Sequence, residues 1–395
     1  MTIAANLQEM IAQSSWIRKM FEEGNKLIQL HGHENVFDFS LGNPIFDPPA
    51  KVSRVLTDLL HEDQKGMHRY MPNAGFVATR EYIASQLKEE TNLPFEQNDI
   101  VMTVGAGGGL NVVLKTLCNP GDEVIVLKPY FVEYGFYAAN HGATIKAVDT
   151  TPEFQIDHEA LEREISEKTR AIIINSPNNP TGVIYPESSL EKLGRLLEEK
   201  SNQFGKEIVL ISDEPYKRIV FDKIQIPSVF QAYSQSIIVT SYSKDLALAG
   251  ERIGYAAISP QMRDKNLLRE GLVLSLRILG FVNAPALMQR LIPLIGDSMI
   301  NLAPYQKNRD ILYNHLVQVG FNCVKPDGAF YLFPQCPIED DIAFIQEAQK
   351  LNLLLVPGSG FGKPGYFRIA FCFETYMIER SLPLFTKLAQ QYNLC

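Results

Sequence analysis

Short apolar runs alternate with amphipathic segments through the middle of the chain, from about residue 76 to residue 260. The amphipathic segments, such as 107–118 and 187–202, repeat their apolar residues every three or four positions, which predicts helices. The apolar runs are short and lack a polar face, which predicts the strands of a parallel sheet covered by helices on both sides. The expected strands are 99–104, 123–128, 171–175, 208–213 and 236–241.

The two ends of the chain show different patterns. Residues 7–31 have the spacing of an amphipathic helix, and the turn-rich stretch 41–50 follows them as a linker. Near the other end, a helical pattern at 304–319 precedes short strand-like pieces. We therefore predict an α/β protein with two parts, a large domain with a mainly parallel sheet and covering helices, and a smaller α+β domain formed by both chain ends. The expected boundaries are 46–285 for the large domain, and 1–45 with 286–395 for the small one.

The overall charge limits the possible partners. The chain has 395 residues and a net charge of −8 without a basic cluster, which argues against nucleic acid or an anionic membrane as a partner. Its five cysteines are dispersed without paired spacing, as is typical of a reducing compartment. No signal peptide or membrane-spanning run is visible, so we expect a cytoplasmic protein. The histidines show no metal-ligand spacing, and we predict no metal site.

Chemically distinctive residues follow several of the expected strands. The strand at 99–104 leads into "GAGGG", the strand at 208–213 ends on Asp213, and the strand at 236–241 is followed by "YSK", which contains Lys244. Ligands of an open α/β sheet bind beyond the carboxyl ends of its strands, so we expect these residues to share one crevice. A glycine turn before a helix also offers backbone N–H groups to an anion. The dinucleotide fingerprint fits poorly, because Leu110 stands where its third glycine belongs.

Asp213, Lys244 and Arg252 each allow two interpretations. Taken alone, Asp213 is more simply a helix cap or a paired core carboxylate, and the two cations are more simply surface charges. Taken together with the glycine turn, they indicate a phosphorylated aldehyde cofactor held by a lysine imine. In that interpretation Asp213 keeps a heteroaromatic nitrogen protonated, and the cationic ring accepts electrons.

Four segments in order, "SPNNPTG", "SDEPY", "SYSKDLALAGERIGY" and "FRIAF", resemble the class I and II aminotransferases of pyridoxal-phosphate fold type I. The resemblance extends over essentially the whole chain, from "LGNP" at 41–44 to Arg368. It implies an enzyme that depends on pyridoxal 5'-phosphate and moves an amino group between an amino acid and a 2-oxo acid through a lysine aldimine.

The same resemblance implies individual roles. Lys244 corresponds to the imine lysine and proton carrier, Asp213 to the partner of the ring nitrogen, and Tyr216 to a hydrogen-bond partner of the ring oxygen. Phe131 corresponds to the aromatic residue that stacks on the ring, and Asn179 shares the ring oxygen with Tyr216. The other implied cofactor ligands are Ala106, Gly107, Ser241, Ser243, Arg252 and Tyr70.

The resemblance also implies how substrate binds and how the chain assembles. Arg368 corresponds to the arginine that binds the α-carboxylate of the substrate, and Gly42 and Asn179 are expected beside it. Tyr70 resembles a tyrosine that reaches the cofactor phosphate of a neighbouring subunit, which implies a homodimer with shared active sites.

Rival functions stay open at this point. A β-eliminating lyase on the same fold would need the same lysine, aspartate and arginine. A non-catalytic ligand-binding regulator is disfavoured by the intact Lys244, and a nicotinamide dehydrogenase by the poor glycine fingerprint.

The glycine turn bears on the choice of substrate. An aspartate-using subgroup of the family typically carries a lysine at the position of Gly107, so this chain lacks that cation. Burying the distal carboxylate of a dicarboxylic amino acid without a partner is costly, and we therefore expect a neutral amino donor. Arg18 and Arg277 are the alternative cations, although both are more simply surface charges.

Overall fold

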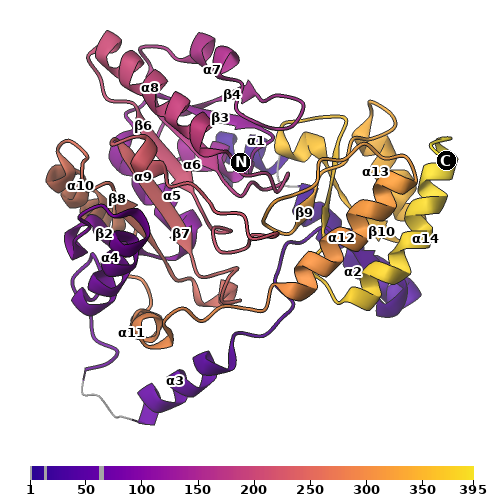
Figure 1. The fold of residues 1–395 in the computed structure, drawn as a ribbon, viewed down its shortest axis with the longest axis horizontal. Helices are drawn as coiled ribbons and strands as arrows, with labels where there is room; N and C mark the ends of the chain where they lie inside the picture. Colours follow the sequence, from indigo (N-terminus) through magenta and orange to yellow (C-terminus); the bar gives the residue numbers. More distant parts are fainter. Residues whose placement is uncertain (1, 13–15, 62–65) are drawn as a thin grey trace.

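The computed structural model describes residues 2–12, 16–61 and 66–395 (Figure 1). Its centre is a seven-stranded sheet in the order β2-β8-β7-β6-β5-β3-β4. β8 runs antiparallel to both of its neighbours, and the other pairs are parallel. The strands are β2 (Ile100–Thr103), β3 (Glu123–Lys128), β4 (Thr144–Asp149), β5 (Thr169–Asn175), β6 (Val209–Asp213), β7 (Ser236–Ser241) and β8 (Gly254–Ile258).

Helices cover both faces of this sheet, as the apolar runs predicted. On one face the buried side chains of the strands pack with those of α5 (Gly105–Leu117), α6 (Glu133–Ala139) and α10 (Lys265–Ile278). Six other helices contribute to the buried cluster on the opposite face. They are α3 (Ala50–His61), α4 (Val77–Thr91), α7 (His158–Glu164), α8 (Glu187–Phe204), α9 (Val229–Ala232) and α11 (Ala286–Ile295).

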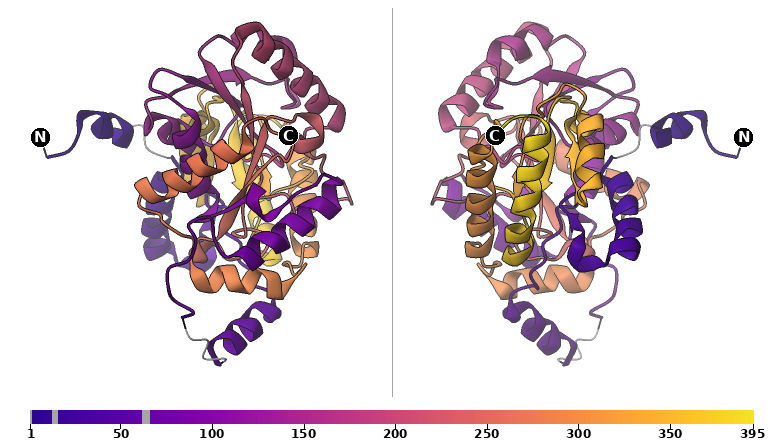
Figure 2. Two further views of the ribbon diagram at one scale, coloured as in Figure 1. Left: turned by 90° about the vertical axis from the view of Figure 1, so that its left-hand side faces the viewer. Right: turned by 90° about the vertical axis from the view of Figure 1, so that its right-hand side faces the viewer.

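A second group of elements comes from both ends of the chain (Figures 1 and 2). β1 (Phe37–Asp38) pairs with β10 (Leu353–Leu354), and β12 (Phe367–Ala370) lies between β11 (Val356–Pro357) and β9 (Tyr331–Leu332). These short sheets share a separate apolar core with long helices near the carboxyl end. The helices of the two ends are α1 (Ala5–Ala12), α2 (Trp16–His31), α3 (Ala50–His61), α12 (Ala303–Gln318), α13 (Asp341–Lys350) and α14 (Thr375–Gln391).

The expected α/β class and mainly parallel sheet are confirmed. The sequence analysis missed two strands of the seven-stranded sheet. β4 carries polar side chains at the edge of the sheet, and β8 begins at the end of the segment that was chosen for its lysine and arginine. The single helix expected at 7–31 corresponds to α1 and α2, and residues 13–15 between them lie outside the described part. None of the helices in the described ranges is long and apolar enough to span a membrane.

The domain boundaries stay predictions. The parallel pairing of Phe37 with Leu353 supports a smaller domain built from both ends. α11 instead contacts α3 and α4, and its buried residues join the core of the large sheet. This packing favours an upper boundary of the large domain beyond Ile295.

Candidate active site

One cavity of about 360 Å³ lies beyond the carboxyl ends of β5, β6 and β7. The parallel register places Asn175 beside Asp213, and the Asn175 side-chain amide donates a hydrogen bond to the Asp213 backbone carbonyl at 2.7 Å. The cavity brings together twelve predicted residues: Gly42, Ala106, Gly107, Phe131, Asn179, Asp213, Tyr216, Ser241, Ser243, Lys244, Arg252 and Arg368.

Lys244 reaches this cavity from the turn that follows β7. Its Nζ donates a hydrogen bond to the backbone carbonyl of Gly42 at 2.8 Å, which links the sheet to the segment before α3. Burial lowers the pKa of Lys244 to about 8, with a smaller contribution from the positive charges of Arg368 and Arg252. A lysine with such a pKa is neutral in a sizeable fraction near physiological pH, so it can act as a nucleophile or a base.

Asp213 is a buried carboxylate with an incomplete set of partners. The Tyr134 hydroxyl donates to its Oδ2 at 2.6 Å, whereas Oδ1 is buried without a hydrogen-bond partner among the described residues. Burial raises the pKa of Asp213 to about 7, against the hydrogen bond from Tyr134, which lowers it. A buried acceptor of this kind is stabilised by a cationic or N–H group placed against Oδ1.

The start of α5 forms a positive cradle at the same cavity. Gly105 has a φ of +73°, and a Cβ built there would lie 2.8 Å from Nη2 of Arg252. The guanidinium therefore lies against the first turn of α5, where Ala106 and Gly107 also line the cavity. Backbone N–H groups at a helix start combine with a guanidinium to make an anion site, and the buried hydroxyls of Ser241 and Ser243 line the same cavity.

Arg368 is almost fully buried, with 1% of its surface exposed. Its guanidinium donates to the Asn179 side-chain oxygen at 2.9 Å and to the Ser40 backbone carbonyl, while Nε is buried without a partner among the described residues. The same group lies 4.5 Å from the ring centroid of Tyr331. No carboxylate forms an ion pair with Arg368 in the described part of the chain, so it can bind the carboxylate of a ligand in a charge-assisted way.

Three tyrosines of the site were missed in the sequence. Tyr134 holds Asp213, the Tyr331 hydroxyl lies 2.8 Å from the Tyr216 hydroxyl, and Tyr137 lines the cavity beside Gly107. The helical spacing of Phe131, Tyr134 and Tyr137 is a signal that could have identified two of them, because side chains three positions apart share a helix face.

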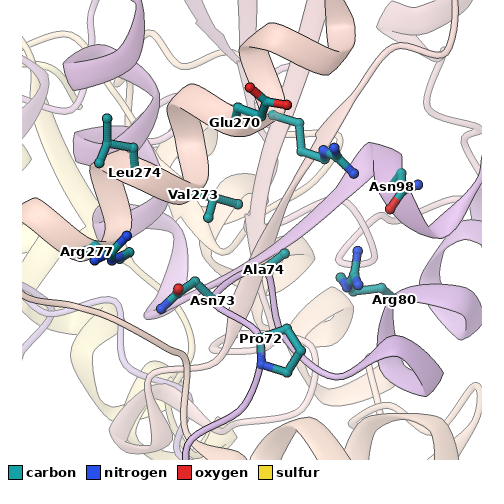
Figure 3. Close-up of a pocket in the computed structure, with 10 residues that line it drawn as sticks. Pro72, Asn73, Ala74, Arg80, Asn98, Glu270, Val273, Leu274 and Arg277 are labelled. Atoms are coloured by element: carbon teal, nitrogen blue, oxygen red, sulfur yellow. The ribbon is translucent and has the colours of Figure 1, made fainter.

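Tyr70 and Arg277 lie away from this cavity within the chain. Tyr70 is 89% exposed and does not line the site. Figure 3 shows Arg277 on α10 at a separate pocket, together with Asn73 and Arg80. The suggestion that Arg277 reaches the site of its own chain is therefore wrong. The side chain of Arg18 lies outside the described part.

A mainly parallel sheet that gathers a low-pKa lysine, a buried aspartate and an anion cradle at its strand ends is the arrangement of fold type I enzymes. The pattern of aminotransferase class I and II matches residues 34–382, and the chain belongs to this family. It is therefore an aminotransferase, which moves an amino group between an amino acid and a 2-oxo acid. The family depends on pyridoxal phosphate. Across the described ranges, no cluster of three or more His, Cys, Asp or Glu side chains could hold a metal ion.

Known relatives and solved structures agree with this assignment. A probable aspartate aminotransferase of Methanocaldococcus jannaschii is 32% identical over 361 residues, which are 89% of this chain and 92% of that protein. An aminotransferase structure from Eubacterium rectale superposes with a TM-score of 0.96 at 39% identity and covers both chains fully. The Thermus thermophilus aspartate aminotransferase with maleate gives a TM-score of 0.86 at 25% identity, covering 98% of this chain and 100% of the other.

Proposed function

We propose that the cavity at the strand ends holds pyridoxal 5'-phosphate and that Lys244 binds it covalently. The observation that carries this proposal is the buried Oδ1 of Asp213, an acceptor without a partner among the described residues in a cavity that also contains a low-pKa lysine. A protonated ring nitrogen supplies the missing donor. When bound, the cofactor supplies an aldehyde carbon that takes up the amino group and a cationic ring that accepts electrons.

The remaining residues take up positions around the group. The start of α5, with Ala106 and Gly107, binds the phosphate together with three side chains, and Phe131 stacks on the ring. Asn179 and Tyr216 bind the ring oxygen. The side chains around the phosphate are those of Ser241, Ser243 and Arg252.

Arg368 binds the α-carboxylate of the substrate, with Gly42 beside it. A charge-assisted pair of this kind contributes about 1.5–3 kcal/mol and orients the substrate in the cavity. Once the amino group of the substrate had taken the place of Lys244 on the cofactor, the released Nζ would be a free amine that could move a proton at the substrate α-carbon. General base catalysis favours such a transfer when the pKa is close to the working pH.

Borohydride reduction followed by peptide mapping tests the assignment of Lys244. The reagent should fix the cofactor to Lys244, because that lysine alone is proposed to bind it covalently. Lys244→Ala should lose turnover yet keep measurable cofactor affinity through the phosphate contacts. A label on any other lysine contradicts the assignment.

A half-reaction distinguishes transamination from the lyase alternative. Mixing the loaded enzyme with an amino acid alone should convert the cofactor to its pyridoxamine form, with one 2-oxo acid released per site. Continued release of ammonia with the cofactor returned to its starting form would instead establish a β-eliminating lyase.

We propose that the amino donor has a side chain without negative charge, although several relatives are named aspartate aminotransferases. The cations that line the cavity are Lys244, Arg252 and Arg368, and each has a role in this proposal. Gly107 adds no charge. A distal carboxylate would therefore lack a partner among the described residues that line the cavity.

A further inference from the structure

The active-site cavity contains a second carboxylate, Glu133, that the proposed function does not use. Glu133 is the first residue of α6 and lines the cavity together with Tyr134 and Tyr137 of the same helix. Its side chain is half-buried, and its carboxylate has no hydrogen bond or ion pair within the described ranges. Burial alone raises the pKa of Glu133, which agrees with a carboxylate that has no cation nearby.

The charges of the cavity leave Glu133 without a counter-ion once the cofactor and the substrate carboxylate are bound. In the proposed function Arg252 would bind the phosphate, Arg368 the α-carboxylate, and Asp213 the ring nitrogen. Lys244 would be a neutral amine once the amino group of the substrate had displaced it. Among the described residues that line the cavity, Glu133 therefore stays the one carboxylate without a partner, and such a group is stabilised by a cation that a ligand brings.

Glu133 also lies near Gly107, a position without a charged side chain. Tyr137 is one helical turn further on, and its hydroxyl lies 3.0 Å from the position of a Cβ built on Gly107. Burial raises the pKa of Tyr137, the negative charges of Glu133 and Asp213 raise it further, and the positive charge of Arg252 lowers it, so Glu133 and Arg252 both lie near this tyrosine. The proposed function commits Arg252 to the cofactor phosphate. An acidic side chain that entered this end of the cavity would therefore meet the charge of Glu133 without a free cation beside it.

We propose that Glu133 sets the donor specificity by binding amino acids whose side chain ends in an ammonium group and by rejecting those with an acidic side chain. The proposal rests on the proposed function of the cavity. It assigns the donor to the diamino acids, the class that includes ornithine and lysine, and so replaces the neutral donor expected from the sequence. The discrimination has an attractive part and a repulsive part, and both are carried by one carboxylate.

Equilibrium binding of unreactive carboxylates tests the proposal without turnover. Glutarate, hexanoate and 6-aminohexanoate share a carboxylate for Arg368 and differ in the charge of the distal end. Wild-type enzyme loaded with cofactor should bind 6-aminohexanoate at least about tenfold more tightly than glutarate. Glu133 attracts the ammonium group of 6-aminohexanoate and repels the second carboxylate of glutarate. Absorbance titration of the cofactor measures all three affinities.

The variant Glu133→Gln should remove this discrimination. Its kcat/KM for ornithine relative to norvaline should fall about tenfold, and its kcat/KM for glutamate relative to norvaline should rise by a similar factor. Glu187→Gln is the matched control, because Glu187 is an exposed residue outside the cavity and its removal changes the net charge equally. Glu133→Ala serves as a second variant that also lacks the charge.

The proposal is overturned if the kcat/KM ratios for ornithine and glutamate relative to norvaline stay within about threefold of wild type in both Glu133 variants. A wild-type preference for glutamate over norvaline also overturns it. The proposed function fails in a different way. If no amino acid converts the cofactor to its pyridoxamine form, the cavity is not a transaminase site, whereas a change in the ratios requires that this conversion takes place.

Discussion

Asp213 is a residue whose buried carboxylate lowers the stability of the folded protein. The folded protein buries this carboxylate with a hydrogen bond to one oxygen and none to the other among the described residues. Its pKa of about 7 lies above the ordinary value of 3.8, so the ionised form disfavours the folded state. In the proposed function, a protonated cofactor ring would remove this penalty by supplying a positive partner for the carboxylate.

Asp213→Asn should therefore stabilise the cofactor-free protein at pH 8 while it abolishes most turnover. Protonation of Asp213 favours the folded wild type, and that contribution is lost as the pH rises to about 7. We expect a gain in the free energy of unfolding of about 1 to 3 kcal/mol at pH 8, reduced because the new amide N–H₂ needs a partner. Urea unfolding at pH 8 and pH 5 checks this.

The gain in the free energy of unfolding of Asp213→Asn over wild type should shrink at pH 5, where Asp213 is already protonated in the folded wild type. A variant that is less stable than wild type at pH 8, or one that keeps full turnover, would show that Asp213 serves the fold rather than the cofactor.

The residues of the site were predictable from the sequence to very different degrees. Lys244, Asp213 and Arg368 are polar residues next to apolar runs, and this contrast is visible without a structure. Glu133 and Tyr331 have no such signal, because a glutamate at a helix start and a tyrosine in an aromatic segment are ordinary in any fold. Their roles depend on which long-range neighbours the fold supplies.

At the scale of elements, the parallel register of β5, β6 and β7 creates the site. Asn175 aligns with Asp213, and Asp213 with Val239, so the residues after each strand emerge at the same edge. The sequence predicted these strands because both of their faces are apolar. It did not predict β8. This strand follows β7 through the connection 242–253 and pairs with it antiparallel. The direction of a strand relative to its neighbour is not visible in the hydrophobic pattern of the strand itself.

Gly105→Ala should weaken cofactor binding through the start of α5. Its φ of +73° disfavours any side chain by about 1–2 kcal/mol. The new Cβ would also lie 2.8 Å from Nη2 of Arg252, which is too close, so the guanidinium would have to move. We expect the dissociation constant of pyridoxal phosphate to rise at least about tenfold, because the phosphate loses part of its cradle. Absorbance titration of the cofactor-free protein measures this.

Gly121→Ala provides the matched control for Gly105→Ala. Gly121 has a φ of +90°, and a Cβ there would have no atom within 4 Å. Both variants should lose similar stability, but only Gly105→Ala should lose cofactor affinity. Equal losses of affinity in the two variants would mean that the effect comes from general strain and not from Arg252.

At the scale of the whole molecule, the site connects the large sheet with the elements from the chain ends. Lys244 donates to the Gly42 carbonyl, and Arg368 donates to the Ser40 carbonyl. A Cβ built on Gly42 would lie 1.9 Å from the Tyr331 hydroxyl, so this position has no room for a larger residue. Movement of one part relative to the other would therefore change the surroundings of the substrate carboxylate directly.

The surface near α3, α10 and α11 supports the proposal of a homodimer. Large apolar side chains are exposed there, and Figure 2 (left) turns this side of the molecule toward the viewer. They are Leu60, Leu267, Leu274, Ile278 and Leu294. Exposed apolar side chains on these three helices favour a protein–protein contact, and the exposed Tyr70 is then free to enter the site of a second copy.

Mixing two inactive variants tests whether the sites are shared. Tyr70→Ala and Lys244→Ala should each be nearly inactive as pure proteins, because one lacks the proposed phosphate contact and the other the catalytic amine. In a hybrid dimer, one site combines both lesions and the other site has neither. After subunit exchange by mild denaturation and refolding at equal concentrations, random pairing should restore about a quarter of the wild-type activity. Mass spectrometry of tagged subunits verifies the exchange, and the absence of restored activity in a verified hybrid would mean that Tyr70 does not complete the site of a partner.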